Sequence, residues 1–447
     1  MNVAWAYAAF VVVAAAAFWL WTPRVALLVV LLGGWVALPV GHYPAAANAA
    51  GLPYWIIGTA LPSDMLFTKA WIAPLVAFAG VLIVDRRSAL EWRPCTYDAP
   101  VVLFCAWPLI QHAIGLGVTP APIASTLYLL GSWGLPWCLG RCYFASPPHR
   151  ILLVQGLVWS GLALLPIALA EGVIGPFVYD AVYGPHPFRN DGDVRYLGFR
   201  PLALFENGNQ YGLWICLCAL AATWCWRAGC LRGPVSAAIV ALTLLVMAVA
   251  SQSVGAIVLL AAGLALLAAL RYVRPLRLAT GVLVVAVLGG AVYGSGVVPV
   301  TQIAKETVAG RAVLDAFRAA GRNSFTWRIA RDQQALAQIR KAPLMGAGRW
   351  DWWRDAGARP WGLVLLLVGQ FGLLGALAAL SILVAPVFRA AATQPAGVAW
   401  RVGQVSIVLA ILVVLALIDM VLNSFIFFPA IVAAGSLAAN ARTEAST

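Results

Sequence analysis

Long apolar runs separated by short polar segments dominate the chain. They lie at about residues 4–21, 24–40, 71–84, 100–118, 121–140, 151–170, 209–226, 234–250, 253–270, 279–296, 361–386, 402–421 and 424–440. A helix needs about 20 apolar residues to cross a bilayer, and most of these runs approach that length. The pattern predicts an all-α, polytopic integral membrane protein with about 12–13 transmembrane helices.

The composition supports the same fold class. Of the 447 residues, 63% are hydrophobic and 10% are charged, whereas about 25% of the residues of an average soluble domain are charged. Too few polar side chains are available to cover a large core in water, which excludes a soluble enzyme, a nucleic-acid-binding protein and a disordered scaffold. Membrane lipids are the expected surroundings, and no nucleic acid is expected as a partner.

The arginines predict the orientation of the chain, because cytoplasmic loops are enriched in Lys and Arg. Short arginine-bearing loops alternate with the predicted spans; they carry Arg86, Arg87, Arg93, Arg141, Arg150, Arg227, Arg232, Arg271, Arg274, Arg277, Arg389 and Arg401. This leaves two long loops, at about 171–208 and 297–360, on the periplasmic face. None of the eight cysteines lies in either loop, so no disulfide framework is expected.

Three parts follow from this layout. Residues 1–296 hold transmembrane helices and the first periplasmic loop, at about 171–208. Residues 297–360 form a large periplasmic loop with two amphipathic helices, within 304–321 and 324–341, where apolar residues recur at helical spacing opposite charged ones. Residues 361–447 hold the last three transmembrane helices and a short cytoplasmic tail.

Arginines in both long loops suggest an anion site. Arg is costly near hydrocarbon unless it faces water or an anionic partner, and its planar fork binds phosphate oxygens in pairs. A polyprenyl pyrophosphate would present such an anion at the membrane surface. The alternative is that these arginines are solvated charges on amphipathic helices.

Several short motifs lie in and beside the two loops. The first loop ends in Arg195-Tyr-Leu-Gly198-Phe-Arg200, followed by Asn207-Gly-Asn209 before a span. The second loop contains Ser324-Phe-Thr-Trp327-Arg328, Ala335-Leu336-Ala-Gln-Ile339 and Pro343-Leu-Met-Gly346-Ala-Gly348, and the next span contains Gly372-Leu-Leu-Gly375. In order, spacing and placement, these motifs resemble the bacterial O-antigen polymerase and ligase superfamily.

The resemblance implies a membrane glycosyltransferase of the GT-C type, in the bacterial inner membrane and with its active site on the periplasmic side. It would take a glycan from undecaprenyl pyrophosphate and transfer it to a hydroxyl, without a metal or other cofactor. By position, Arg195 or Arg200 and Arg328 would contact the pyrophosphate, with Asn209 and Arg331 as supporting residues. A flippase and a chain-length regulator are the implied protein partners.

The chain departs from the family at one place. Ligases and many polymerases carry a His-Asn pair just before the span that ends in Gly-Leu-x-Gly, whereas Trp361-Gly362 stands here. The family His has been regarded as the base that activates the acceptor, so the departure weakens a ligase assignment.

Four residues in the loops are candidates for the missing base, because the acceptor hydroxyl must lose a proton as it attacks. They are Glu206, Asp351, Asp355 and His186, the one His in either long loop. Ion pairing with neighbouring arginines is the alternative for Asp351 and Asp355, and a surface role is the alternative for His186. Asp419 lies within an apolar run, one helical turn before Asn423, and is either functional or part of a structural hydrogen bond.

These observations favour a polysaccharide polymerase, for O-antigen or exopolysaccharide, that joins lipid-linked repeat units. A ligase that moves a finished glycan to lipid A core or another acceptor is the first alternative. A transporter of lipid-linked sugars is another, and it predicts broken helices, pseudo-symmetric halves and charges along both leaflets. A non-catalytic assembly partner is the last.

Overall fold

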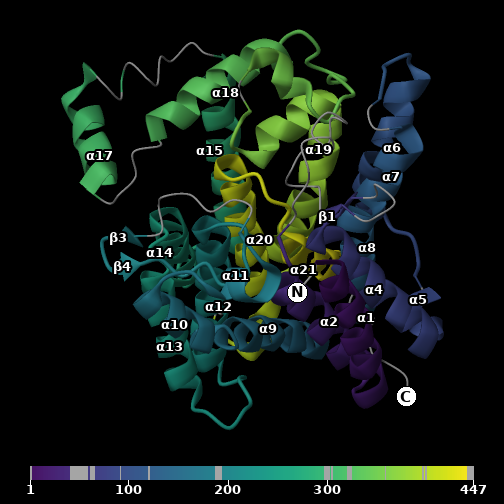
Figure 1. The fold of residues 1–447 in the computed structure, drawn as a ribbon, viewed down its shortest axis with the longest axis vertical. Helices are drawn as coiled ribbons and strands as arrows, with labels where there is room; N and C mark the ends of the chain where they lie inside the picture. Colours follow the sequence, from purple (N-terminus) through teal and green to yellow (C-terminus); the bar gives the residue numbers. More distant parts are fainter. Residues whose placement is uncertain are drawn as a thin grey trace.

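A computed structural model describes residues 3–40, 59–60, 66–90, 92–118, 121–186, 194–295, 303, 306–319, 325–357, 359–394, 397 and 400–439. The chain is mostly helical (Figure 1). The longer helices are α1 (Val3–Leu20), α2 (Pro23–Ala37), α4 (Lys69–Val84), α6 (Ala99–Ala113), α7 (Pro122–Leu129), α8 (Leu135–Tyr143), α9 (Pro147–Leu162), α10 (Leu165–Ile174), α12 (Gly208–Ala228), α13 (Ala237–Ala250), α14 (Val254–Ala269), α15 (Pro275–Ser295), α17 (Val308–Ala319), α18 (Phe325–Ile339), α19 (Leu363–Ala392), α20 (Val405–Leu422) and α21 (Phe428–Ala438).

Short elements connect these helices. They are α5 (Arg86–Leu90), α11 (Val178–Tyr183), the 3-10 turns Thr96–Asp98, Trp352–Ala356 and Val402–Gln404, and a π-helical turn, Leu130–Gly134, between α7 and α8. Two antiparallel hairpins are present: β1 (Thr59–Ala60) pairs with β2 (Leu66–Phe67), and β3 (Val194–Arg195) pairs with β4 (Gly198–Phe199).

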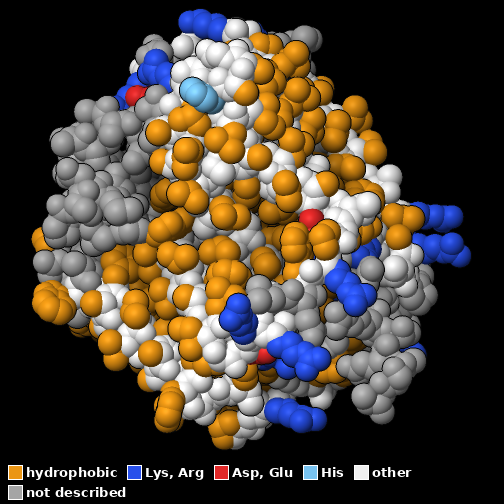
Figure 2. All heavy atoms as spheres, turned by 90° about the vertical axis from the view of Figure 1, so that its right-hand side faces the viewer, with side chains coloured by type: hydrophobic (Ala, Val, Ile, Leu, Met, Phe, Trp, Pro, Cys, Tyr) orange, Lys and Arg blue, Asp and Glu red, His pale blue; other side chains and the backbone are white. Residues whose placement is uncertain are grey.

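Each apolar run predicted from the sequence coincides with a helix or with helices joined end to end. Within the part of the chain that the structure describes, four helices are long and apolar enough to cross a membrane: Pro147–Ile174, Pro275–Tyr293, Leu363–Ala392 and Val402–Leu422. Most of the other apolar helices are shorter, so the count of 12–13 spans stays a prediction. Figure 2 shows a broad face of hydrophobic side chains, with Lys and Arg mostly toward its edges.

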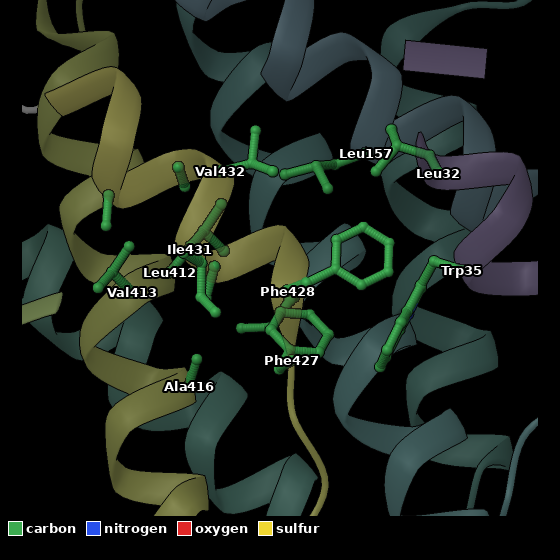
Figure 3. Close-up of a cluster of buried hydrophobic side chains, with 14 of the residues drawn as sticks. Leu32, Trp35, Leu157, Leu412, Val413, Ala416, Phe427, Phe428, Ile431 and Val432 are labelled. Atoms are coloured by element: carbon green, nitrogen blue, oxygen red, sulfur yellow. The ribbon is translucent and has the colours of Figure 1, made fainter. Parts of the chain in front are cut away.

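The centre of the molecule is packed with apolar side chains. Trp35 of α2 meets Phe427 and Phe428 edge-on, with ring centroids 5.2 and 5.3 Å apart (Figure 3). Helix α21 lies against α8, and glycines make this contact close: a Cβ on Gly140 would stand 2.0 Å from the Val432 carbonyl oxygen. Small residues allow helix backbones to approach in this way.

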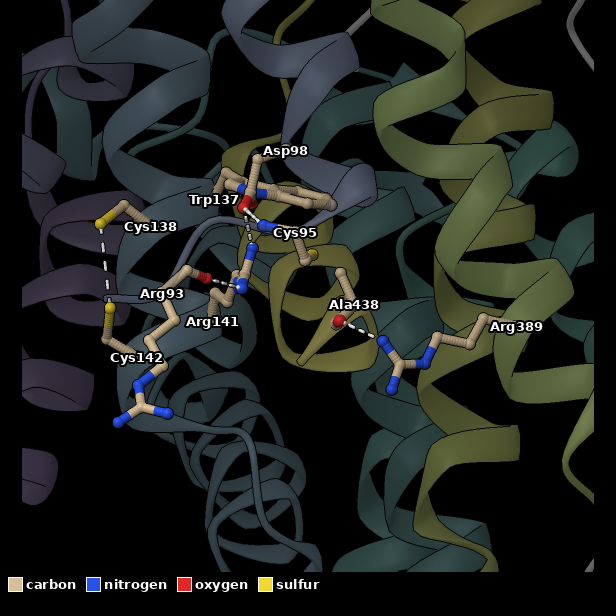
Figure 4. Close-up of polar contacts among 9 residues, drawn as sticks. All are labelled: Arg93, Cys95, Asp98, Trp137, Cys138, Arg141, Cys142, Arg389 and Ala438. Carbon is tan, nitrogen blue, oxygen red and sulfur yellow. Dashed lines mark hydrogen bonds and ion pairs between the residues drawn. The ribbon is translucent and has the colours of Figure 1, made fainter. Parts of the chain in front are cut away.

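The arginine-bearing loops that the sequence predicts on one side contact one another. Arg141 binds the Asp98 carboxylate and the Arg93 carbonyl, and Arg389 binds the Ala438 carbonyl (Figure 4). Arg150, which is buried, donates to the Ser436 carbonyl at the same end of α21. The predicted grouping of these loops therefore agrees with the fold.

The two amphipathic helices predicted in the second loop are present as α17 and α18, at the top of Figure 1. Ala335, Leu336 and Ile339 form the buried face of α18 and pack with Trp352. This contact fixes the end of the second loop against the rest of the molecule. All eight cysteines are free thiols.

Candidate functional site

The first long loop is held in place by a buried carboxylate. Glu171, at the end of α10, is fully buried, and its Oε2 accepts hydrogen bonds from the backbone N–H groups of Leu202 (2.8 Å) and Ala203 (2.6 Å). Its Oε1 accepts from the Val178 N–H at 3.2 Å. One side chain thus ties both ends of the loop together. Glu171 was not predicted as a site residue. Its neighbours along the chain are apolar, and they do not indicate that loop backbone lies beside its side chain.

The Arg-x-x-Gly and Asn-x-Asn motifs meet at the break between α13 and α14. Arg200 donates from Nε to the Ser251 carbonyl and from Nη2 to Asn209 Oδ1, both at 3.1 Å. Ser253 Oγ also donates to Asn209 Oδ1, at 3.4 Å. Arg200 is only 5% exposed, so it mainly locks the loop to this break. The cap of α12 is Asn207, whose side chain accepts from two backbone N–H groups, rather than Asn209.

Arg195 lies on the β3–β4 hairpin, which the same break supports. Gln252 Oε1 accepts from the Leu197 N–H at 3.1 Å, and its Nε2 donates to the Phe199 carbonyl at 3.0 Å. Arg195 Nη1 donates to the Gln252 carbonyl at 3.3 Å and is half-buried. Among the described residues other than glycine, only Gln252 and Ala203 have a positive φ, 52° and 49°. Strained backbone of this kind gathers at functional sites, and both residues lie beside the first loop.

His186 supports the backbone directly before Glu206. Its Nε2 donates to the Phe205 carbonyl at 3.0 Å, its ring meets Tyr179 edge-on, and its side chain is buried. The Asp180 carboxylate accepts from the His186 N–H at 3.0 Å. These contacts are those of a residue that positions the backbone of the first loop.

Glu206 is the candidate base that the fold places among charged groups. It is half-buried, and its carboxylate makes no hydrogen bond to any described residue. Burial raises the pKa of Glu206, while the positive charges of Arg359 and Lys69 act to lower it. These cations come from the end of the second loop and from the start of α4. No sequence pattern places Lys69 beside this loop, because about 137 residues separate Lys69 from Glu206 along the chain.

The glycine motifs of the second loop and of α19 form one structural joint. Helix α19 breaks at Gly372, which has φ of 71°, and the Pro343–Gly348 segment fills the break. Leu373 N–H donates to the Pro343 carbonyl (2.8 Å), and Gly348 N–H donates to the Gln370 carbonyl (3.0 Å).

Side chains of α6 complete this joint. Gln111 Nε2 donates to the Gln370 carbonyl at 2.8 Å, and Trp107 Nε1 donates to the Phe371 carbonyl at 2.8 Å. A Cβ on Gly346 would stand 2.3 Å from the Gly372 nitrogen, so only glycine fits there. The motifs therefore anchor the second loop to the helices.

The Trp361-Gly362 pair lies directly before α19 and packs against the end of α20. A Cβ on Gly362 would stand 2.3 Å from the Val421 carbonyl oxygen, which leaves no room for the Asn found in the family. Arg359 lies over the Trp361 ring and donates from Nη2 to Ser424 Oγ at 2.7 Å.

Two other candidate residues, Asp351 and Asp419, differ from Glu206 because their carboxylates bond to described side chains. Asp351 pairs with Arg349 at 3.3 Å and with Arg354 at 3.8 Å, as expected for the alternative to a base. Asp419 is buried and accepts from Asn423 Nδ2 at 2.7 Å, so the pair forms within the end of α20 rather than between helices.

The second loop holds three more of the predicted site residues, Arg328, Arg331 and Asp355. Arg331 lies half-buried on α18. The side chains of Arg328 and Asp355 lie outside the described part of the structure. Among the residues that the structure describes, no group of three or more His, Cys, Asp or Glu side chains is placed to hold a metal ion.

These features define a mostly helical protein with apolar helices long enough for a membrane and a polar site built from two loops. Residues 239–361 match the family model described as O-antigen ligase. This match covers the second-loop motifs as far as Trp361, and it supports their resemblance to the O-antigen polymerase and ligase superfamily. No curated protein and no solved structure matches the chain. At a coarse level, the match supports a transferase function of the O-antigen ligase or polymerase type.

Proposed function

We propose that this protein is a polysaccharide polymerase of the bacterial inner membrane, a polytopic GT-C-type enzyme whose site faces the periplasm. It transfers a glycan from undecaprenyl pyrophosphate to a sugar hydroxyl of a second lipid-linked repeat unit, without a metal. The observation that carries the proposal is Glu206, a carboxylate of raised pKa in the first loop that lies near Arg359, just inside the end of the family domain.

In the proposed reaction, the acceptor oxygen forms a bond to the anomeric carbon. The bond from that carbon to the pyrophosphate oxygen breaks, and its electron pair leaves with undecaprenyl pyrophosphate. The hydroxyl proton passes to the Glu206 carboxylate, and burial, which raises the pKa of Glu206, makes that carboxylate a better proton acceptor. Glu206 is preferred to His186 because His186 is buried among Tyr179 and the Phe205 carbonyl, whereas Glu206 is half-buried.

Arginines would neutralise the charge of the leaving pyrophosphate. Arg195 suits this role better than Arg200, because Arg195 is half-buried at the edge of the hairpin whereas Arg200 is buried and bonded to Ser251 and Asn209. Arg328 of α18 is proposed as the second contact, on the basis of its motif.

The absence of the family His-Asn pair favours a polymerase over a ligase, and the packing of Gly362 against Val421 supports this choice. The broken helix α19 is a feature that a transporter would also have. In transporters such breaks expose backbone groups to a substrate or ion. Here the carbonyls of Gly369, Gln370 and Phe371 accept hydrogen bonds from the protein itself. This favours a structural joint.

The experiment uses purified protein in lipid nanodiscs with a pyrophosphate-linked repeat unit on a polyprenyl carrier. A mass-resolved gel should show a ladder of longer lipid-linked glycans without added metal or nucleotide sugar. The ladder should disappear with Arg328→Ala and persist with Lys341→Ala, an exposed cation of the same loop. A wild-type protein that extends nothing, but modifies an added lipid A core acceptor, would replace the polymerase with a ligase.

A further inference from the structure

Lys69, at the first residue of α4, is a buried cation without a hydrogen-bond partner. Its side chain is 6% exposed, and its Nζ makes no hydrogen bond to any described residue. Burying an ammonium group without a partner is costly, so the residue requires a reason beyond stability. The protein supplies partial compensation through two aromatic rings.

Those rings face the ammonium group from two elements. Nζ lies 4.8 Å from the centroid of the Trp35 ring and 4.7 Å from that of Phe205. Trp35 itself is fixed by contacts with Phe427 and Phe428 (Figure 3). A cation between two ring faces is favourable, but ring faces satisfy none of the three N–H donors of a lysine. No described residue supplies an acceptor for these donors.

Phe205 is followed directly by Glu206, so the candidate base is adjacent in sequence to a residue that the Lys69 ammonium group contacts. The two charges attract each other, yet no ion pair joins Lys69 and Glu206 within 4.0 Å among the described contacts. A Lys and a Glu that attract each other but are not bonded keep hydrogen-bonding capacity for a third group. A hydroxyl suits both partners, since its oxygen accepts from an ammonium group and its hydrogen donates to a carboxylate.

We propose that Lys69 and Glu206 together form the acceptor subsite and that they bind the attacking sugar hydroxyl between them. This rests on the proposed function. Glu206 takes the hydroxyl proton, and the Lys69 ammonium group donates a hydrogen bond to the oxygen as negative charge develops on it. The combined charge of the pair is zero, which suits a neutral hydroxyl better than a pyrophosphate. Arg359 is the other cation near Glu206, and it is engaged by Ser424 and Trp361.

The test compares Lys69→Met with Lys341→Met, a lysine exposed on the second loop. Methionine keeps the length and apolar character of the side chain but removes the donors. Chain extension at saturating donor should fall about 100-fold or more, the loss expected when one donor to a developing oxyanion is removed. Binding of undecaprenyl pyrophosphate should be unchanged, and the melting temperature should stay the same or rise. Lys341→Met should match wild type in all three.

A double-variant measurement keeps the proposal falsifiable if folding is affected. Lys69→Met should add little to the loss already caused by Glu206→Gln, because both residues act on one hydroxyl. Three results would overturn the subsite: extension at the wild-type rate, weaker binding of undecaprenyl pyrophosphate, or a lower melting temperature with multiplying losses in the double variant. If wild-type protein extends no glycan, the proposed function itself fails, which is a distinct outcome.

Discussion

Replacing Gly372 by alanine should break the joint that holds the second loop. Gly372 has φ of 71°, a conformation that costs an L-residue about 1–2 kcal/mol. A Cβ there would also stand 2.1 Å from the Leu344 carbonyl oxygen. The backbone must shift, which weakens the bonds from Leu373 to Pro343 and from Leu374 to Leu344. Each is worth about 1 kcal/mol net, so the total loss is about 3–4 kcal/mol.

Gly281 provides the matched control. It lies in α15 with helical backbone, and a Cβ there would meet nothing within 4 Å. Gly281→Ala should therefore stabilise the protein slightly, by about 0.5–1 kcal/mol. The assay is thermal unfolding of the purified protein followed by tryptophan fluorescence, with loss of at least about 5 °C for Gly372→Ala. Equal melting temperatures for the two variants would refute the account of this joint.

Three further substitutions test the frame of the site. Gly362→Ala should lower the melting temperature, because its Cβ would meet the Val421 carbonyl oxygen at 2.3 Å; an unchanged value would show that the backbone adjusts freely. Glu171→Gln should make residues 171–208 more sensitive to limited proteolysis, because an amide cannot accept all three backbone N–H groups; unchanged cleavage would count against this role. His186→Phe should slow chain extension without moving its pH profile, since His186 positions the backbone before Glu206; a lost acidic limb would instead make His186 the base.

The positions of the helices follow from the sequence because apolar length determines them. The two amphipathic helices of the second loop, α17 and α18, follow for a similar reason, since their apolar residues recur at helical spacing. Local pattern carries this information, and it needs no knowledge of neighbours.

The site follows less well, because its contacts join distant segments. Asn209 was predicted as a supporting residue, but its contacts with Arg200 and Ser253 across the first loop follow from no local pattern. Gly346 and Gly372 were recognised as motif residues, whereas their shared joint depends on the backbone of two segments. Lys69 belongs to a different helix from Glu206, and no periodicity relates the two residues.

The central claim is that Glu206 accepts the proton of the attacking hydroxyl. The most direct measurement is the initial rate of chain extension against pH, for wild type and for Glu206→Gln. A base must be ionised, so the wild-type rate should fall as the pH drops through a pKa above the ordinary value of 4.5. Glu206→Gln should lose about 100-fold or more at every pH while it still binds undecaprenyl pyrophosphate and melts no lower than wild type. Extension by Glu206→Gln at the wild-type rate, with the same acidic limb, would contradict the account.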